Sequence, residues 1–116
     1  MKRDALTMTL LYDYYGAVLS DKQRTCFDLY YNQDFSLAEI AEELGISRQG
    51  VHESVTRAEQ LLSSMEEKTG CIAKEERLQA ALAVIDRCTA QLLDTQDETA
   101  QRLAREIRAA AQSIKE

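Results

Sequence analysis

The sequence predicts an all-α protein, and three observations carry that prediction. The 116 residues include no proline and only four glycines, so the chain has few of the residues that enforce turns. Apolar residues recur at spacings of three and four along most of the chain, as one face of a helix requires. Ser/Thr-x-x-Gln/Glu patterns, which begin helices as capping boxes, precede three of these stretches.

The first two helices are expected before residue 33. The first should cover residues 4–19, although Gly16 costs it about 1 kcal/mol relative to alanine. Ser20 and Gln23 form a capping box, so the second helix should begin there and run to about Asn32. The apolar faces are expected to be Leu11, Tyr14, Tyr15 and Val18 in the first helix and Cys26, Phe27 and Tyr30 in the second.

A short third helix is expected over residues 37–44. Ser36 and Glu39 form the capping box that begins it. Gly45 should end it, because glycine adopts the left-handed conformation at little cost. The residues that share its apolar face are Leu37, Ile40, Ala41 and Leu44.

The fourth helix is the longest feature of the N-terminal half. Ser47 should cap it, and it should run over residues 48–68 until Gly70 stops it. At 1.5 Å per residue it is about 30 Å long, which is more than a small domain needs. Its apolar positions are Val51, Val55, Ala58, Leu61, Leu62 and Met65.

Residues 71–116 differ in composition, because aromatic residues vanish and alanine becomes frequent. A fifth helix is expected over 74–93 and a sixth over 96–114, with Thr95 and Glu98 as a capping box between them. The short connection predicts an antiparallel hairpin. The apolar positions, in heptad-like register, are Leu78, Ala81, Leu82, Ile85, Cys88 and Leu92, then Ala100, Leu103, Ala104, Ile107, Ala111 and Ile114.

We therefore expect two parts, a four-helix domain over 1–70 and a C-terminal two-helix arm over 71–116. A two-helix arm cannot bury all of its own apolar surface. It should dock on the fourth helix, on a second subunit, or on both. We expect a homodimer built from the first helix, the fourth helix and the arm.

Residues 36–57, SLAEIAEELGISRQGVHESVTR, read as helix, tight turn and second helix. This is the pattern of a helix-turn-helix, whose second helix enters the major groove of DNA with its N-terminal end first. Arg48 could pair with guanine and Gln49 with adenine. The candidate groove-facing residues are Arg48, Gln49, His52, Thr56 and Arg57, and the candidate phosphate contacts are Lys22 and Arg24.

The charge balance favours a second hypothesis. The net charge is -6, and residues 36–60 hold five acidic side chains against two basic ones. A protein that coats nucleic acid by bulk charge is therefore excluded. The alternative is an acidic adaptor that meets a basic partner. Its candidate binding residues are Glu39, Glu42, Glu43 and Glu53.

The stretch LSDKQRTCFDLYYNQDFSLAEIAEELGISRQGV resembles region four of bacterial sigma factors. With LLYDYY before it and MEEK after it, the chain more closely resembles the YlxM family. That resemblance implies an all-helical, cytoplasmic, dimeric bacterial protein that binds DNA and regulates the signal recognition particle pathway. In the adaptor alternative, the partner would be the particle's GTPase or its RNA. Gly50 and Ser54 depart from the residues usual at these positions.

Enzyme chemistry is not expected. The sequence has no phosphate-binding loop, no G-x-S-x-G and no H-E-x-x-H, and its one histidine, His52, has no partner of its kind. The three cysteines form no C-x-x-C, so neither a disulfide framework nor a metal site is expected. No cofactor is implied. The N-terminus reads as neither a signal peptide nor a membrane span, so we expect a cytoplasmic protein.

Overall fold

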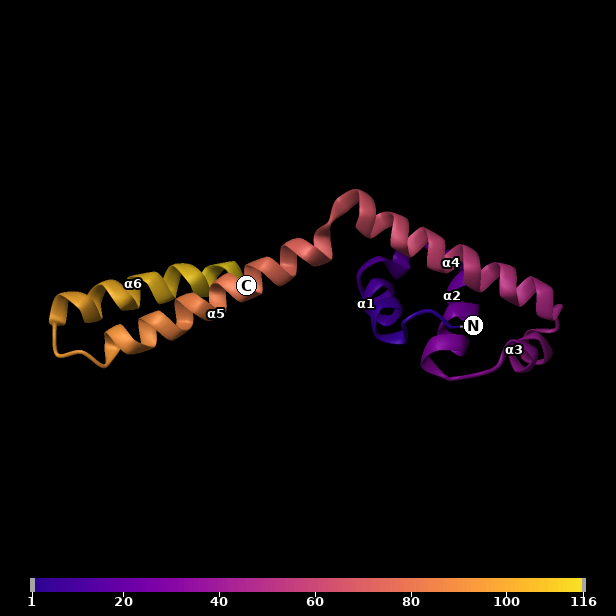
Figure 1. Ribbon diagram of the computed structural model, residues 1–116, viewed down its shortest axis with the longest axis horizontal. Helices are drawn as coiled ribbons and strands as arrows, with labels where there is room; N and C mark the ends of the chain where they lie inside the picture. Colours follow the sequence, from indigo (N-terminus) through magenta and orange to yellow (C-terminus); the bar gives the residue numbers. More distant parts are fainter. Residues whose placement is uncertain (1, 116) are drawn as a thin grey trace. The chain divides into compact units, whose positions relative to one another are not determined.

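The computed structural model describes residues 2–115, and within that range it contains helices, turns and no strand. The prediction of an all-α protein is confirmed. The chain divides into two compact units, Met1–Ile72 and Ala73–Glu116 (Figure 1). No helix of the described part is both long and apolar enough to cross a membrane.

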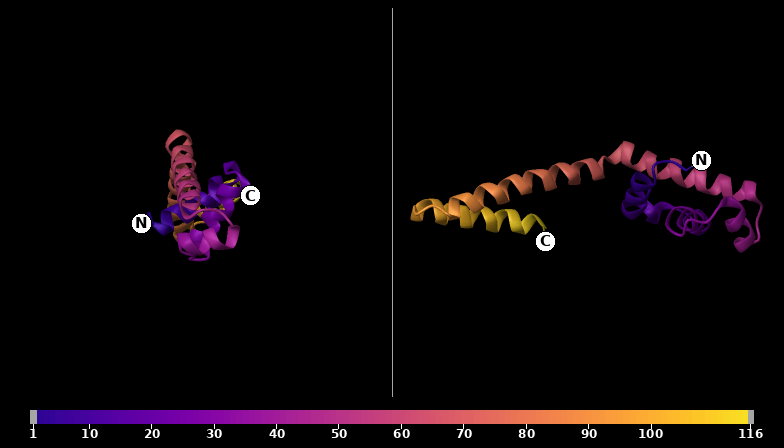
Figure 2. Two further views of the ribbon diagram at one scale, coloured as in Figure 1. Left: turned by 90° about the vertical axis from the view of Figure 1, so that its right-hand side faces the viewer. Right: turned by 60° about the horizontal axis from the view of Figure 1, so that its bottom comes forward.

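Unit 1 contains four α-helices, and the longest of them is packed against the other three (Figures 1 and 2). The helices are α1 (Ala5–Tyr15), α2 (Asp21–Phe27), α3 (Leu37–Leu44) and α4 (Arg48–Thr69). A 3-10 turn, Gly16–Val18, follows α1, and a π-helical turn, Asp28–Asn32, follows α2. Helix α2 starts with the predicted capping box of Ser20 and Gln23.

The first helix is shorter than predicted, and its buried face is different. A Cβ at Gly16 would lie 3.4 Å from the Tyr12 ring, and the α-helix ends just before this buried glycine. Tyr14 and Val18, predicted in the apolar face, are 44% and 45% exposed. The buried residues are instead Met8, Leu11 and Tyr15, followed by Leu19.

The core of unit 1 consists of two clusters of buried residues, and α4 contributes residues to both of them. In the first, Phe27 stacks on Tyr12 with ring centroids 4.9 Å apart and also contacts Tyr31. In the second, Ile40 and Val51 are fully buried and join α3 to α4. Burial at this level stabilises each large apolar side chain by about 1.5–3 kcal/mol.

Unit 2 consists of most of α5 (Cys71–Leu93) and all of α6 (Glu98–Lys115), which lie side by side and antiparallel (Figures 1 and 2). Its fully buried seam is thin. The residues in it are Leu82 and Thr89 from α5 and Ala104 and Ala111 from α6. Arg108 Nε donates to Thr89 Oγ1 at 3.1 Å and ties the two helices together.

Both helices start at positions other than those predicted. Helix α5 starts directly after Gly70, because Thr69 Oγ1 and Glu66 Oε1 accept the backbone N–H groups of Cys71 and Ile72. The predicted capping box of Thr95 and Glu98 is wrong. Asp97 caps α6 instead, with Oδ1 accepting the N–H of Thr99 at 2.9 Å. Thr95 Oγ1 donates to the carbonyl of Leu92.

Candidate nucleic-acid interface

The helix-turn-helix geometry is fixed by local hydrogen bonds at both sides of the turn. Gly45 adopts φ 69° and ψ 33°, in the left-handed region, and its N–H donates to the carbonyl of Ala41. Ser36 and Glu39 form the predicted capping box of α3. Ser47 Oγ accepts the N–H of Gly50 at 2.9 Å and caps α4. These local hydrogen bonds fix the residues at which α3 ends and α4 begins.

The first turn of α4 presents two free polar side chains. Arg48 and Gln49 are both exposed. Neither takes part in a side-chain hydrogen bond or ion pair recorded for residues 2–115. Their amide and guanidinium groups are therefore available to base edges or phosphates.

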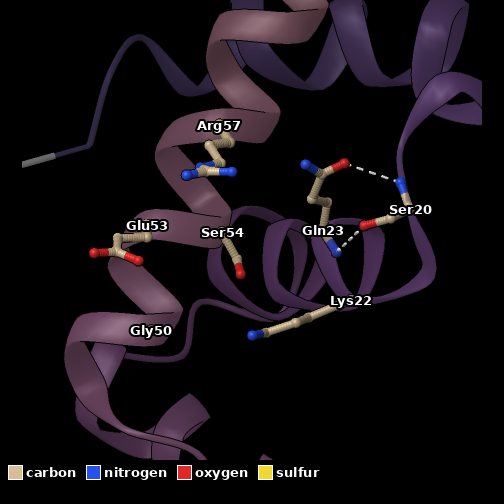
Figure 3. Close-up of a pocket in the computed structure, with 7 residues that line it drawn as sticks. All are labelled: Ser20, Lys22, Gln23, Gly50, Glu53, Ser54 and Arg57. Atoms are coloured by element: carbon tan, nitrogen blue, oxygen red, sulfur yellow. Dashed lines mark hydrogen bonds between the residues drawn. The ribbon is translucent and has the colours of Figure 1, made fainter.

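The remaining predicted residues of α4 fall on two flanks of the helix. His52 and the half-buried Thr56 line a crevice of about 40 Å³ with Tyr30 and Leu37. Arg57 lies on the other flank, where it lines a hollow of about 290 Å³ (Figure 3). The structure therefore does not bring all five predicted groove residues to one patch.

The two residues predicted to contact phosphate, Lys22 and Arg24, also lie in different surroundings. Lys22 extends from α2 toward α4 and lines the same hollow as Arg57 (Figure 3). Arg24 turns back instead, and its Nη2 donates to the carbonyl of Leu19 at 3.4 Å. Lys22 is thus available to an anion beside α4, while Arg24 is engaged with its own backbone.

The predicted carboxylates do not form one surface either. Glu39, Glu42 and Glu43 line a hollow of about 320 Å³ with Phe35, while Glu53 lines the hollow that holds Arg57. Glu39 is engaged, since its Oε1 accepts the N–H of Ser36 at 2.9 Å. The hydrogen bonds from the Ser36 backbone and side chain hold the pKa of Glu39 below its usual value.

Glu59 is one of the five acidic side chains counted in residues 36–60, but it does not add charge to the surface. It is only 8% exposed, and it accepts a hydrogen bond from the Tyr31 hydroxyl. Burial, followed by that hydrogen bond, raises the pKa of Tyr31. The Glu59 carboxylate therefore acts inside the unit, where it accepts the hydrogen bond of the half-buried Tyr31 hydroxyl.

Sequence reasoning missed three polar residues around the hollow, Ser20, Gln23 and Ser54. Ser54 is only 8% exposed and lies beside the buried thiol of Cys26. Burial raises the pKa of that thiol. The capping box had marked Ser20 and Gln23 as structural residues, and nothing in the sequence indicated that α4 passes beside them.

The described residues contain no group of three or more His, Cys, Asp or Glu side chains that could hold a metal ion. Cys26, Cys71 and Cys88 are all free thiols. What the surface of unit 1 does offer is a capped, well-packed helix pair with free polar side chains at the start of its second helix.

This arrangement defines the class of helix-turn-helix proteins. The chain belongs to the family UPF0122, described as "Putative helix-turn-helix protein, YlxM / p13 like", whose model matches residues 2–105. The resemblance inferred from the sequence is therefore confirmed at the level of the family. The family is one of helix-turn-helix proteins rather than of enzymes.

Relatives of similar length support the same assignment. A UPF0122 protein of Caldanaerobacter subterraneus subsp. tengcongensis is 50% identical over 88 residues, covering 76% of this chain and 75% of the relative. One from Symbiobacterium thermophilum is 38% identical over 102 residues, covering 88% and 92%. One from Acetivibrio thermocellus is 51% identical over 65 residues, covering 56% of each chain.

Proposed function

We propose that this protein is a regulator that binds double-stranded DNA through α3 and α4 and acts in the signal recognition particle pathway. The observation that carries the DNA-binding part is the exposed N-terminal turn of α4, where Arg48 and Gln49 lie unengaged beyond a fixed turn. Arg48 and Gln49 read bases in this proposal, and Lys22 contacts phosphate. The link to the particle rests on the resemblance to the YlxM family.

The test is a binding series with the full chain. Duplex DNA from upstream of its own gene is compared with a scrambled duplex of equal length at several salt concentrations. We expect preference for the upstream duplex and a loss of affinity as salt rises. Arg48→Ala should remove about 1–3 kcal/mol of that preference. An unchanged preference would show that Arg48 does not read bases.

The acidic adaptor remains the second candidate function, and one observation favours it. Glu42 and Glu43 are exposed and line a hollow beside Phe35, so this face combines negative charge with an aromatic surface. Such a surface suits a basic partner, which would be the particle's GTPase or its ribonucleoprotein. Changing Glu42 and Glu43 to lysine should then weaken particle binding and leave DNA binding intact. Particle binding that is equal before and after the change would reject this candidate.

A homodimer is part of the proposal, and unit 2 supports it. One flank of the hairpin is polar, because Lys115 Nζ pairs with Asp86 Oδ2 at 3.2 Å beside the Arg108–Thr89 bond. On the opposite flank, helical spacing brings together positions 78, 81, 85, 88 and 92 of α5 and positions 100, 103, 107, 110 and 114 of α6, and none of these ten residues is charged. The large apolar side chains on it are Leu78, Ile85, Leu92, Leu103, Ile107 and Ile114.

We name these six residues the apolar stripe. A second copy can cover it, because two hairpins packed through the same stripe form a four-helix bundle. Ile107, 43% exposed, lies in the stripe, whereas Val84, 46% exposed, lies outside it. Sedimentation equilibrium should show a dimer for the unaltered chain and for Val84→Glu, and a monomer for Ile107→Glu. If the unaltered chain is monomeric at every concentration, the proposed dimer is rejected.

A further inference from the structure

The hollow between α2 and α4 is lined by hydrogen-bond donors from both helices. Lys22 and Gln23 reach it from α2, and Arg57 reaches it from α4 (Figure 3). The hydroxyl groups of Ser20 and Ser54 lie at its walls. With Glu53 as its one carboxylate, the lining carries a net positive charge on a protein whose net charge is -6.

The capping box of α2 sets the direction of the Gln23 amide. Its Oε1 accepts the backbone N–H of Ser20 at 2.9 Å, and this contact uses the acceptor end of the amide. The NH2 end is therefore the one left over, and it points toward Arg57 (Figure 3). An amide held in this way presents donors to the hollow without further loss of side-chain entropy.

The two cations that line the hollow are not neutralised. The ion pairs recorded for residues 2–115 involve neither Lys22 nor Arg57. Glu53 precedes Arg57 by one helical turn, yet the two form no ion pair. In Figure 3 the Glu53 carboxylate projects from the side of α4 away from Ser54 and Gln23. An anion entering between α2 and α4 would therefore meet donors first.

We propose that this hollow holds one backbone phosphate of bound double-stranded DNA, with Lys22, Gln23 and Arg57 as its ligands. The inference rests on the proposed DNA-binding function and gives separate roles to two sets of residues. Arg57 and Gln23 position the protein on the duplex, whereas Arg48 and Gln49 read bases. Contacts to phosphate fix register and orientation and carry no sequence information directly.

Gln23→Glu tests the proposal while preserving the cap. Glutamate serves in the same position of the α3 capping box, where Glu39 accepts the N–H of Ser36. The substitution therefore keeps the start of α2 and replaces two donors with a carboxylate that repels phosphate. Gln33→Glu is the matched control, because Gln33 is exposed, lies outside the hollow and undergoes the same change of charge.

The readout is affinity for the upstream and the scrambled duplex over a salt series. Gln23→Glu should weaken binding to both duplexes by the same factor, about tenfold or more. It should also lower the salt slope by about 1 relative to Gln33→Glu. Arg57→Gln should behave in the same way. Circular dichroism confirms that all variants keep their helices.

Each other outcome has a distinct meaning. If the unaltered chain prefers the upstream duplex but Gln23→Glu and Gln33→Glu bind equally, the phosphate site is wrong and the proposed function stands. If the unaltered chain binds both duplexes equally, the proposed regulator is rejected. The difference in salt slope between Gln23→Glu and Gln33→Glu then still tests the phosphate site. If it binds neither duplex, both are rejected. Saturable binding of inorganic phosphate alone, without DNA binding, would overturn the DNA assignment in favour of a small-anion site.

Discussion

The two units cover their apolar surface to very different degrees. Unit 1 packs thirteen buried residues into two clusters, and Phe27 stacks on the ring of Tyr12 in the first of them. Its fully buried side chains include Phe27, Met8 and Leu62. Among residues 73–115, the described part of unit 2, only Leu82, Thr89, Ala104 and Ala111 are buried, and the apolar stripe lies open.

The difference follows from composition and from the number of helices. Four helices can surround a core, whereas each helix of a hairpin has a single neighbour. Alanines such as Ala104 and Ala111 allow the helices of unit 2 to approach but bury little area. Unit 1 therefore has the means to hold a site in fixed geometry, and unit 2 has an unfilled face that suits association.

The largest expected effect is the loss of a core ring in unit 1. Phe27→Ala removes a fully buried side chain that contacts both Tyr12 and Tyr31, and it should destabilise unit 1 by about 3–5 kcal/mol. The matched change in unit 2, Leu82→Ala, should cost about 2 kcal/mol, the low end for leucine, because the thin seam can collapse.

Native-state hydrogen exchange measures the two units separately. Phe27→Ala should lower protection over residues 5–72 and leave 73–115 nearly unchanged. Leu82→Ala should do the reverse. If either substitution lowers protection equally in both units, they unfold as one cooperative body, and the contrast between them does not extend to stability.

The sequence predicted best those features that depend on a few neighbouring residues. The capping boxes at Ser20 and Ser36 and the stop at Gly45 are local, and all three are present. The burial of Glu59 depends on packing against Tyr31, which lies 28 residues earlier in the chain. Spacing along the chain carries no information about such a contact, so the burial of Glu59 was missed.

The candidate site shows the same division. Exposure of Arg48 and Gln49 follows from helical periodicity once the buried positions of α4 are known. The hollow that holds Arg57 requires α2 to lie beside α4, with Gln23 oriented by its cap. The sequence indicated Gln23 only as part of a capping box, and the structure shows that the NH2 group of its amide faces the hollow.

A smaller effect tests whether the turn of the helix-turn-helix is as rigid as the core. Gly45→Ala places a side chain at φ 69° and should destabilise unit 1 by about 1–2 kcal/mol, although the Cβ meets no atom within 4 Å. Gly50→Ala is the control. It gains up to about 1 kcal/mol of helix propensity, but its Cβ would lie 3.1 Å from Ser47 Oγ, so it should be nearly neutral. Urea unfolding measures both, and equal effects would show that strain at Gly45 is relieved by local movement.

The smallest expected effect concerns pH, and it belongs to unit 1, because all five tyrosines lie there. Burial and the hydrogen bond to Glu59 raise the pKa of Tyr31, so the folded chain keeps a proton that the unfolded chain loses near pH 10. The contribution of Tyr31 to the free energy of unfolding is therefore fully present below about pH 10, and it falls as the pH rises above that value.

Tyr31→Phe should flatten that fall, which urea unfolding from about pH 8 to pH 11 would measure. Some pH dependence should remain, because burial also raises the pKa values of Tyr12 and Tyr15. Unit 2 has no tyrosine, so exchange protection over 73–115 should not follow this dependence. A parallel loss of protection there would mean that the arm depends on the fold of unit 1, and the contrast between a closed unit and an open one would then describe their surfaces only.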